Sequence, residues 1–198
     1  LLRRTGARAA ALNDLAGIVT VTNRDLLVRT ATELSGDGAA IRYITEPAGR
    51  NTAPAVAVAA LEASLVWGDA AVLFVMPADH WIKNVSAFVA DAQAAAKLAS
   101  RGRLVTFGIA PTRAETGFGW LELGDAVDGT AGFEVRRFVE KPPADVAREF
   151  AADGGHLWNA GLFCFTAGAI LAAFERHAPA LLDAARESWM AAGRREVQ

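Results

Sequence analysis

The stretch "AVLFVMPADHWI", residues 71–82, decides the fold class. A continuous apolar run ends abruptly at Pro77, and Asp79 and His80 follow it. Such a run, bounded by a turn signal, is typical of a strand that helices cover on both faces. Ligands of open α/β sheets bind beyond the carboxyl ends of these strands. We therefore expect this strand to carry Asp79 to the place where the sheet meets its ligand.

On either side of this stretch, β-rich apolar runs alternate with alanine-rich segments of helical character, the pattern of stacked βαβ units. After Pro111 a polar turn separates "TGFGWLELG" from "GFEVRRFVEK", which predicts an antiparallel excursion. The sequence predicts one α/β domain over residues 1–198, with a mixed, mainly parallel sheet and helices on both faces. Strands are expected at 17–23, 41–46, 71–76, 103–109 and 156–167, and helices at 24–35, 53–67, 86–100, 143–154 and on both sides of Pro179.

Composition excludes several classes of protein. The formal net charge of −2 excludes the broad basic surface of nucleic-acid binders. The longest apolar runs are far below the ~20 residues that a membrane span needs, so neither nucleic acid nor membrane is an expected partner. The single cysteine, Cys164, cannot form an intrachain disulfide and favours a cytoplasmic setting. No GxxxxGK[ST], HExxH, G-x-S-x-G or paired CxxC motif occurs in the sequence.

The motif "EPAGRNTAPAVAVAAL", residues 46–61, has two interpretations. Asn51 or Thr52 can cap a helix, and a well-capped helix accounts for most of the motif. The alternative is a recognition loop. Gly49, Arg50 and Asn51 lie immediately before the free N–H groups of that helix, which suits an anionic ligand or a polar ring. Capping alone does not explain why all three residues are present.

Asp79 also has two interpretations. It can cap the helix that follows, or it can hold Mg²⁺, which prefers oxygen ligands and commonly takes one or two carboxylates plus substrate phosphates. His80 is interpreted as structural, because His156 and His177 are distant in sequence and no cysteine lies at zinc spacing.

Three further motifs leave similar alternatives open. Gly119 either enters a hairpin turn or lets the backbone approach a ligand. Glu140 and Lys141 form either an exposed ion pair or an acceptor for sugar hydroxyls beside a cation for phosphate. Asn159 interrupts an apolar strand, and a buried amide must be hydrogen-bonded, so it either fixes a loop or meets a polar ligand.

The order and spacing of these motifs resemble the bacterial mannose-1-phosphate guanylyltransferases, a family of sugar-nucleotide nucleotidyltransferases. The motifs that carry the resemblance are "EPAGRNTAPA", "PADH", "LVTFGIAPTRAETGFGWLELG", "FVEKP" and "LWNAGLFCF", and it extends over about residues 1–189. It implies a Rossmann-like, GT-A-like nucleotidyltransferase fold. It also implies a reaction in which mannose 1-phosphate attacks the α-phosphorus of GTP, with GDP-mannose and pyrophosphate as products.

The resemblance also implies roles for particular residues. Asp79 would bind Mg²⁺, and Lys141 would face the sugar phosphate, so these two are the expected catalytic residues. The guanine nucleotide would be held by Glu46, Gly49, Arg50, Asn51 and Thr52, and the mannose by Gly119, Glu140 and Asn159.

Two parts of the family pattern are missing from the sequence. The glycine-rich loop GGxGTRLWPLSR, which cradles the triphosphate in the family, would precede residue 1, and the second metal-binding Asp would follow residue 198. We expect a nucleotidyltransferase domain truncated at both ends, which would not turn over as an isolated piece.

Three alternatives remain open at this point. The first is a related sugar-1-phosphate nucleotidyltransferase that uses another nucleotide or sugar, although the "GRNTAPA" loop argues against it. The second is a non-catalytic subunit that senses GDP-mannose, which retention of Asp79 and Lys141 disfavours. The third is a bifunctional protein with an isomerase domain. The sequence also leaves open whether the protein is a homodimer.

Overall fold

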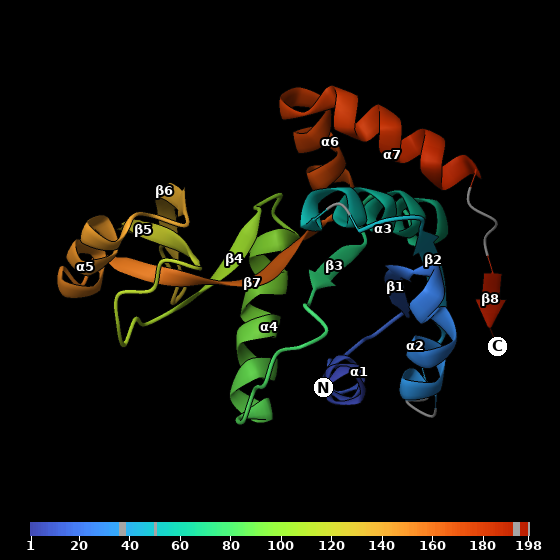
Figure 1. The fold of residues 1–198 in the computed structure, drawn as a ribbon, viewed down its shortest axis with the longest axis horizontal. Helices are drawn as coiled ribbons and strands as arrows, with labels where there is room; N and C mark the ends of the chain where they lie inside the picture. Colours follow the sequence, from blue (N-terminus) through green and yellow to red (C-terminus); the bar gives the residue numbers. More distant parts are fainter. Residues whose placement is uncertain (36–38, 50, 192–194, 198) are drawn as a thin grey trace. The chain divides into compact units, whose positions relative to one another are not determined.

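The computed structural model describes residues 1–35, 39–49, 51–191 and 195–197. They form two compact units, drawn together in Figure 1 and described separately below. Unit 1 consists of Leu1–Val105 and Phe163–Gln198, and unit 2 of Thr106–Leu162. The interpretation of residues 1–198 as one functional domain stays a prediction.

The elements follow the predicted alternation closely. Unit 1 contains α1 (Leu2–Ala10), β1 (Ile18–Asn23), η1 (Arg24–Leu26), α2 (Leu27–Leu34), β2 (Ile41–Glu46), α3 (Thr52–Trp67), β3 (Val72–Val75), α4 (Val85–Ala99), α6 (Ala167–His177), α7 (Pro179–Ala191) and β8 (Arg195–Val197). Unit 2 contains β5 (Gly119–Ala126), β6 (Phe133–Glu140) and α5 (Ala144–Ala152). The chain passes between the units in β4 (Val105–Ile109) and in β7 (His156–Thr166).

Strand pairing confirms a mixed α/β fold but corrects one detail of the prediction. In unit 1, β1 and β2 are parallel, β8 joins β2 antiparallel, and β3 pairs antiparallel with residues 163–166 of β7. In unit 2, β5 pairs antiparallel with both β6 and β7. The prediction of a mainly parallel sheet is therefore wrong for the described residues, where the parallel part is small. An apolar run indicates that both faces of a strand are buried, but it does not indicate whether the strand is parallel or antiparallel to its neighbour.

Unit 1 has a core rich in small residues. Ala57, Ala60 and Ala63 are buried on α3, where they permit the close packing of α6 and α7 against that helix (Figure 1). Glu62 is also buried on α3, and its carboxylate accepts hydrogen bonds from Arg42 Nε at 3.0 Å and Trp189 Nε1 at 2.8 Å. These bonds satisfy the buried charge and connect α3 to β2 and α7.

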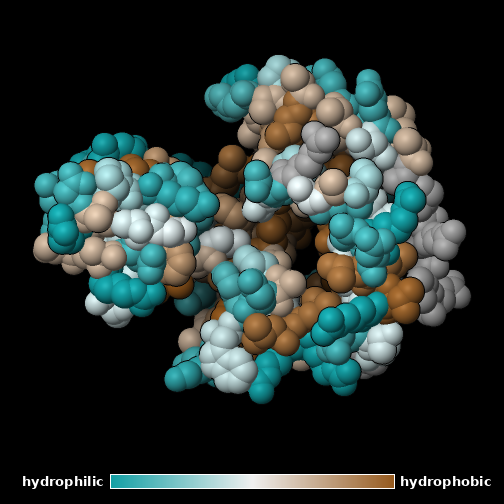
Figure 2. All heavy atoms as spheres, in the orientation of Figure 1, coloured by the Kyte–Doolittle hydropathy of each residue, from teal (hydrophilic) through white to brown (hydrophobic). Residues whose placement is uncertain are grey.

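Unit 2 has an aromatic core. Trp120, Phe150 and Trp158 pack around Ala147, and the ring centroids of Trp120 lie 5.6 Å from Phe150 and 6.1 Å from Trp158. Hydrophilic residues dominate the face of this unit that Figure 2 shows. Within the part of the chain that the structure describes, no helix combines the length and the apolar composition that a membrane crossing requires.

Candidate functional site

Strand register brings three predicted residues of unit 2 side by side. Gly119, the first residue of β5, pairs with Glu140, the last residue of β6. On the other side of β5, Trp120 pairs with Trp158 in antiparallel register. The same register, extended by one residue, places Asn159 opposite Gly119. At one end of the three-stranded sheet, Gly119 therefore lies between a carboxylate-bearing residue and an amide-bearing residue, and it is itself buried.

The backbone of Gly119 lies close to the side chains of Glu140 and Phe138. A Cβ atom at this position would lie 2.8 Å from the Glu140 carboxylate and 2.7 Å from the ring of Phe138. Real Cβ atoms essentially never approach other atoms so closely, so any side chain here displaces the carboxylate or the ring. Gly119 itself is buried, so the structure shows a close approach of its backbone to Glu140, and the ligand interpretation of this glycine stays a prediction.

The oxygen of the Asn159 side-chain amide is hydrogen-bonded within unit 2, whereas the nitrogen forms no hydrogen bond with the described residues. Its Oδ1 accepts hydrogen bonds from Thr106 Oγ1 at 2.8 Å and from the Gly161 N–H at 3.2 Å, so the side chain connects β7 to β4. Its NH₂ group donates to no group among the described residues. The loop-fixing interpretation is therefore confirmed for the oxygen, and the orientation that it imposes leaves the two N–H donors for a polar ligand.

Lys141 follows β6 in a strained conformation. Its φ of 46° lies in the left-handed region, which costs a residue with a Cβ about 1 kcal/mol or more. Its backbone N–H donates to the Phe118 carbonyl at 3.1 Å, which fixes the turn. Its Nζ lies 3.8 Å from Glu140 Oε1, so the exposed ion pair that the sequence allowed is present. Strain of this kind gathers at functional sites, where the surrounding structure maintains it.

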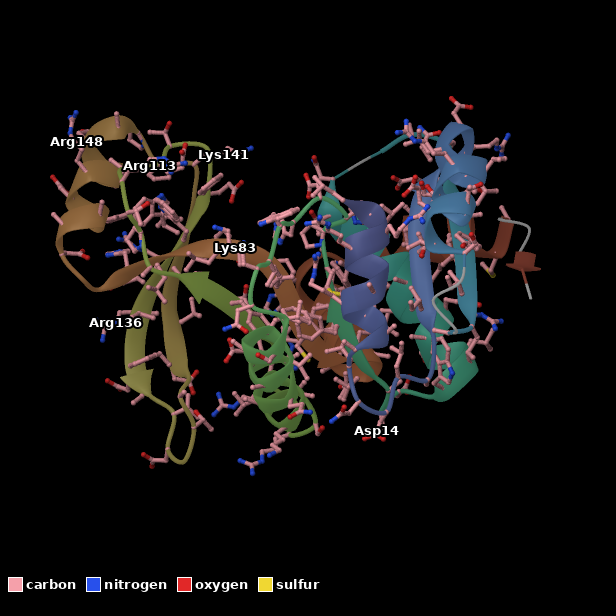
Figure 3. The ribbon with its side chains drawn as sticks, turned by 90° about the horizontal axis from the view of Figure 1, so that it is seen from below. Asp14, Lys83, Arg113, Arg136, Lys141 and Arg148 are labelled. Carbon is pink, nitrogen blue, oxygen red and sulfur yellow. The ribbon has the colours of Figure 1, made fainter. Side chains whose placement is uncertain are left out.

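Arg113 and Glu115 belong to the same end of unit 2, and sequence reasoning did not single them out. Arg113 donates from Nε at 3.2 Å and from Nη2 at 3.0 Å to one oxygen of Glu115, and its guanidinium lies 5.3 Å from the Trp158 ring centroid. Hydrogen bonds from the Gly117 N–H and from Arg113 lower the pKa of Glu115. Figure 3 shows Arg113 and Lys141 at one end of unit 2, whereas Arg136 lies away from that end. The sequence feature that could have indicated these two residues is the Arg-x-Glu spacing in "PTRAETG".

The predicted nucleotide loop lies in unit 1 between β2 and α3. Glu46 ends β2, Gly49 is exposed in the loop, and Thr52 begins α3. Asn51 occupies the N-cap position with a φ of 67°, but its side chain makes no capping hydrogen bond. The first N–H groups of α3 therefore have no side-chain acceptor at the cap, which favours the recognition loop. Arg50 lies outside the described residues.

Asp79 lies in a turn between β3 and α4. The helix-capping interpretation of this residue is wrong, because α4 is capped by Asn84, whose Oδ1 accepts from the Ala87 N–H at 3.0 Å. The Asp79 side chain is exposed and has no hydrogen-bond or ion-pair partner among the described residues. The same residues contain no group of three or more His, Cys, Asp or Glu side chains able to hold a metal ion. A single unpaired carboxylate suits Mg²⁺ that takes its other ligands from phosphates and water.

Each unit thus assembles its own set of predicted residues. Unit 2 brings together Gly119, Glu140, Lys141 and Asn159, whereas unit 1 carries the loop at 46–52 and Asp79 on two separate connections. Chemically, the unit 2 set offers hydrogen-bond donors and acceptors for hydroxyl groups beside cations for phosphate. The unit 1 set offers free backbone N–H groups and a hard oxygen ligand.

A family model and curated relatives both match this chain. Residues 5–197 match the nucleotidyl transferase family. The xanthan biosynthesis protein XanB of Xanthomonas campestris pv. campestris strain B100 is 43% identical over 190 residues, which is 96% of this chain and 40% of that protein. A mannose-1-phosphate guanylyltransferase of Escherichia coli K12 is 42% identical over 152 residues, which is 75% of this chain and 32% of that protein.

A solved structure is similar to this chain over almost its whole length. The crystal structure of a mannose-6-phosphate isomerase from Helicobacter pylori superposes with a TM-score of 0.85 and 30% identity, over 96% of this chain and 70% of that one. The chain spans 40% of the XanB relative that it matches and 32% of the Escherichia coli one. The match to the family covers most of the α1 helix, both site regions and the C-terminal helices.

Proposed function

The chain belongs to the nucleotidyl transferase family, and from this premise we propose that the protein transfers a guanylyl group from GTP to mannose 1-phosphate. A phosphate oxygen of mannose 1-phosphate attacks the α-phosphorus of GTP and forms a new P–O bond. The bond from that phosphorus to the oxygen bridging to the β-phosphate breaks, and pyrophosphate leaves with the electron pair. The relatives named as mannose-1-phosphate guanylyltransferases support the choice of substrates.

One observation carries this proposal: a single sheet end presents Gly119, Glu140 and Asn159 side by side, with Lys141 next in the chain. We assign the mannose to this end of unit 2. The Glu140 carboxylate accepts from sugar hydroxyls, and the Asn159 NH₂ group donates to them. The ammonium group of Lys141 then faces the sugar phosphate, where it supplies a positive charge beside the Glu140 carboxylate.

We assign the guanine nucleotide to the loop at 46–52 of unit 1. The uncapped N–H groups at the start of α3 suit a polar ring or an anion, and the left-handed Asn51 leaves its amide free for the base. Asp79 supplies a carboxylate ligand for Mg²⁺, which neutralises phosphate charge when bound. The remaining work of the chain is to align the two substrates and to exclude water, so no protein nucleophile is required.

The proposal also includes the location of the protein in the cell and its partners. We infer a cytoplasmic location because the one cysteine, Cys164, is a free and fully buried thiol in the described structure. GTP and mannose 1-phosphate are the proposed partners. Homodimerisation is left to measurement, because nothing described above requires a second copy.

The test is Mg²⁺-dependent pyrophosphate release by the protein that contains this chain, with mannose 1-phosphate and GTP, ATP, UTP or CTP. We expect release with GTP, and a loss on the order of 100-fold or more in Asp79→Ala. Asp91→Ala is the matched control, because it removes another exposed carboxylate of the same unit, on α4. Its rate should equal that of the wild type.

The other outcomes separate the alternatives. Release with a different nucleotide would keep the chemistry and reject the guanine assignment. If GDP-mannose binds but no nucleotide supports release, the protein is a sensor and the proposal fails.

A further inference from the structure

Helix α1 contacts the segment that carries Asp79 at two points. Thr5 Oγ1 donates a hydrogen bond to the Ala78 carbonyl at 3.2 Å, one residue before Asp79. The guanidinium of Arg4 lies 3.9 Å from the centroid of the Trp81 ring, two residues after it. Both contacts lie within unit 1, where Figure 1 shows the chain that follows β3 running past α1. The Asp79 turn is thus attached to α1 on both sides, although Asp79 itself makes no contact that would fix it.

A third residue on the same face of α1, Arg8, has no evident structural reason to be charged. Its side chain is buried, with 4% of the residue exposed. Its Nη2 donates to Thr5 Oγ1 at 2.6 Å, whereas its Nε has no partner among the described residues. Burial lowers the pKa of this guanidinium. A buried cation without a carboxylate is costly, and an unsatisfied buried N–H calls for an explanation.

The bond from Arg8 explains the direction of the Thr5 hydroxyl. A hydroxyl oxygen that already accepts from a guanidinium has its own hydrogen left for an acceptor on the other side. The acceptor in reach is the Ala78 carbonyl. A hydrogen bond that involves an ionised group is about twice as strong as a neutral one, and it polarises the next bond in a chain. Arg8 therefore strengthens the one hydrogen bond that fixes the Asp79 turn to α1.

We propose that Thr5 and Arg8 are positioning residues of the metal site, which hold the Ala78–Asp79 turn so that the Asp79 carboxylate meets a divalent cation in one orientation. The inference rests on the proposed function, because it takes Asp79 as the metal ligand. Groups that orient a metal ligand from behind commonly change metal affinity by about ten-fold or more when they are removed. A buried charge is tolerated here because it orders a functional turn.

The test compares variants of the chain by three measurements. Thr5→Val removes the hydroxyl, Thr5→Ser restores it, and Arg8→Met removes the charge at similar volume. The matched control is Thr30→Val, because Thr30 is a helical threonine with the same 7% exposure as Thr5, and its hydroxyl contacts Thr22 instead of the Asp79 turn. The measurements are melting temperature, amide hydrogen exchange of residues 76–82, and Mn²⁺ binding by electron paramagnetic resonance in the presence of GTP.

The expected results separate positioning from packing. Thr5→Val should speed exchange in 76–82 and weaken Mn²⁺ binding about ten-fold, and Thr5→Ser should return both to near wild-type values. Arg8→Met should weaken Mn²⁺ binding without lowering the melting temperature, because it removes a buried charge that no carboxylate of the described residues compensates. Thr30→Val should lower the melting temperature and leave exchange in 76–82 and Mn²⁺ binding unchanged.

Two results would overturn the inference, and they differ in what else they affect. If Thr5→Val and Arg8→Met lower the melting temperature but match Thr30→Val in exchange and Mn²⁺ binding, the two residues only pack α1. If Asp79→Ala binds Mn²⁺ as well as the wild type does, the metal assignment of the proposed function fails, and this inference fails with it. The first result leaves the proposed function intact.

Discussion

The candidate residues of unit 2 are held by strand pairing, whereas those of unit 1 lie on connections between elements. In unit 2, Gly119 and Glu140 are partners in a ladder, and Asn159 follows from the register of the next strand. In unit 1, Asp79 lies in a turn that two contacts attach to α1, the hydrogen bond from Thr5 and the stacking of Arg4 on Trp81. Strand register is fixed by many hydrogen bonds at once, so a single substitution shifts the backbone little. A turn held by two contacts is more easily altered by a single substitution.

The largest effect is expected at Gly119, where a substitution leaves the strand register in place but displaces a neighbouring side chain. Gly119→Ala should lower kcat/KM with mannose 1-phosphate on the order of 100-fold, because the new Cβ must displace the Glu140 carboxylate or the Phe138 ring. Gly124→Ala, on the same strand, is the control, because its Cβ would meet the Glu134 backbone at 3.1 Å, away from the candidate site. Steady-state kinetics check the expectation. Equal losses in the two variants would mean that general disruption of β5 is responsible.

A smaller effect is expected from relief of backbone strain. Lys141→Gly should raise the free energy of unfolding by about 1 kcal/mol, because glycine adopts a positive φ without cost. It should also raise KM for mannose 1-phosphate about ten-fold, because the ammonium group is lost.

Asp14 supplies the control for that experiment, since its φ is 58° and it lies outside both candidate sites. Asp14→Gly should give a similar gain in stability, measured by urea unfolding, with unchanged kinetics. A gain in stability without a kinetic change in Lys141→Gly would remove Lys141 from the site. Urea unfolding and steady-state kinetics of Asn51→Gly test the effect of a positive φ in the same way at the predicted nucleotide loop of unit 1.

The smallest effect on catalysis, none at all, is expected at Cys164, which lies opposite Phe74 in the pairing of β7 with β3. Burial raises the pKa of this thiol from the ordinary value of 9.0 to about 12. Iodoacetamide should therefore not modify the folded protein at pH 8. Between about pH 9 and 12 the unfolded chain loses this proton and the folded chain retains it. Stability should fall as pH rises through that window, by up to ~1.4 kcal/mol per pH unit from this group. Rapid alkylation at pH 8 would show that β3 is less firmly paired than the strands of unit 2.

Much of the architecture was accessible from local patterns. The run that ends before Pro77 predicted β3 and the turn at Asp79, and the Gly- and Asp-rich segment near Gly129 predicted the β5–β6 hairpin. These signals are local, because period and turn chemistry act within a few residues. The direction of β3 was not accessible, because its partner Phe163–Thr166 lies far away in the sequence.

The candidate site shows the same limit. Its residues were predicted from motif order, but which of them touch had to come from the strand register, as with Gly119 and Glu140. Arg8 gave no signal, because an arginine on a polar helix is ordinarily exposed and only tertiary packing buries it. Asn159 was left between two roles, and the structure gives its oxygen one role and leaves its nitrogen for the other.

Strand β7 has a consequence for synthesis on the ribosome. Unit 2 is one uninterrupted stretch of chain, so all of its residues have been synthesised once Leu162 has been added. Synthesis of unit 1 starts first, but unit 1 is the last to be complete. Its strand β3 pairs with residues 163–166, and its helix α3 packs against α6 and α7. Chains generally fold from the N-terminus onward as they emerge, and local contacts form faster than distant ones. Here the inserted segment reaches its final form before the segment that precedes it. During that interval the apolar strand that leads to Asp79 lacks the strand with which it pairs, so its edge is open to pairing with other chains.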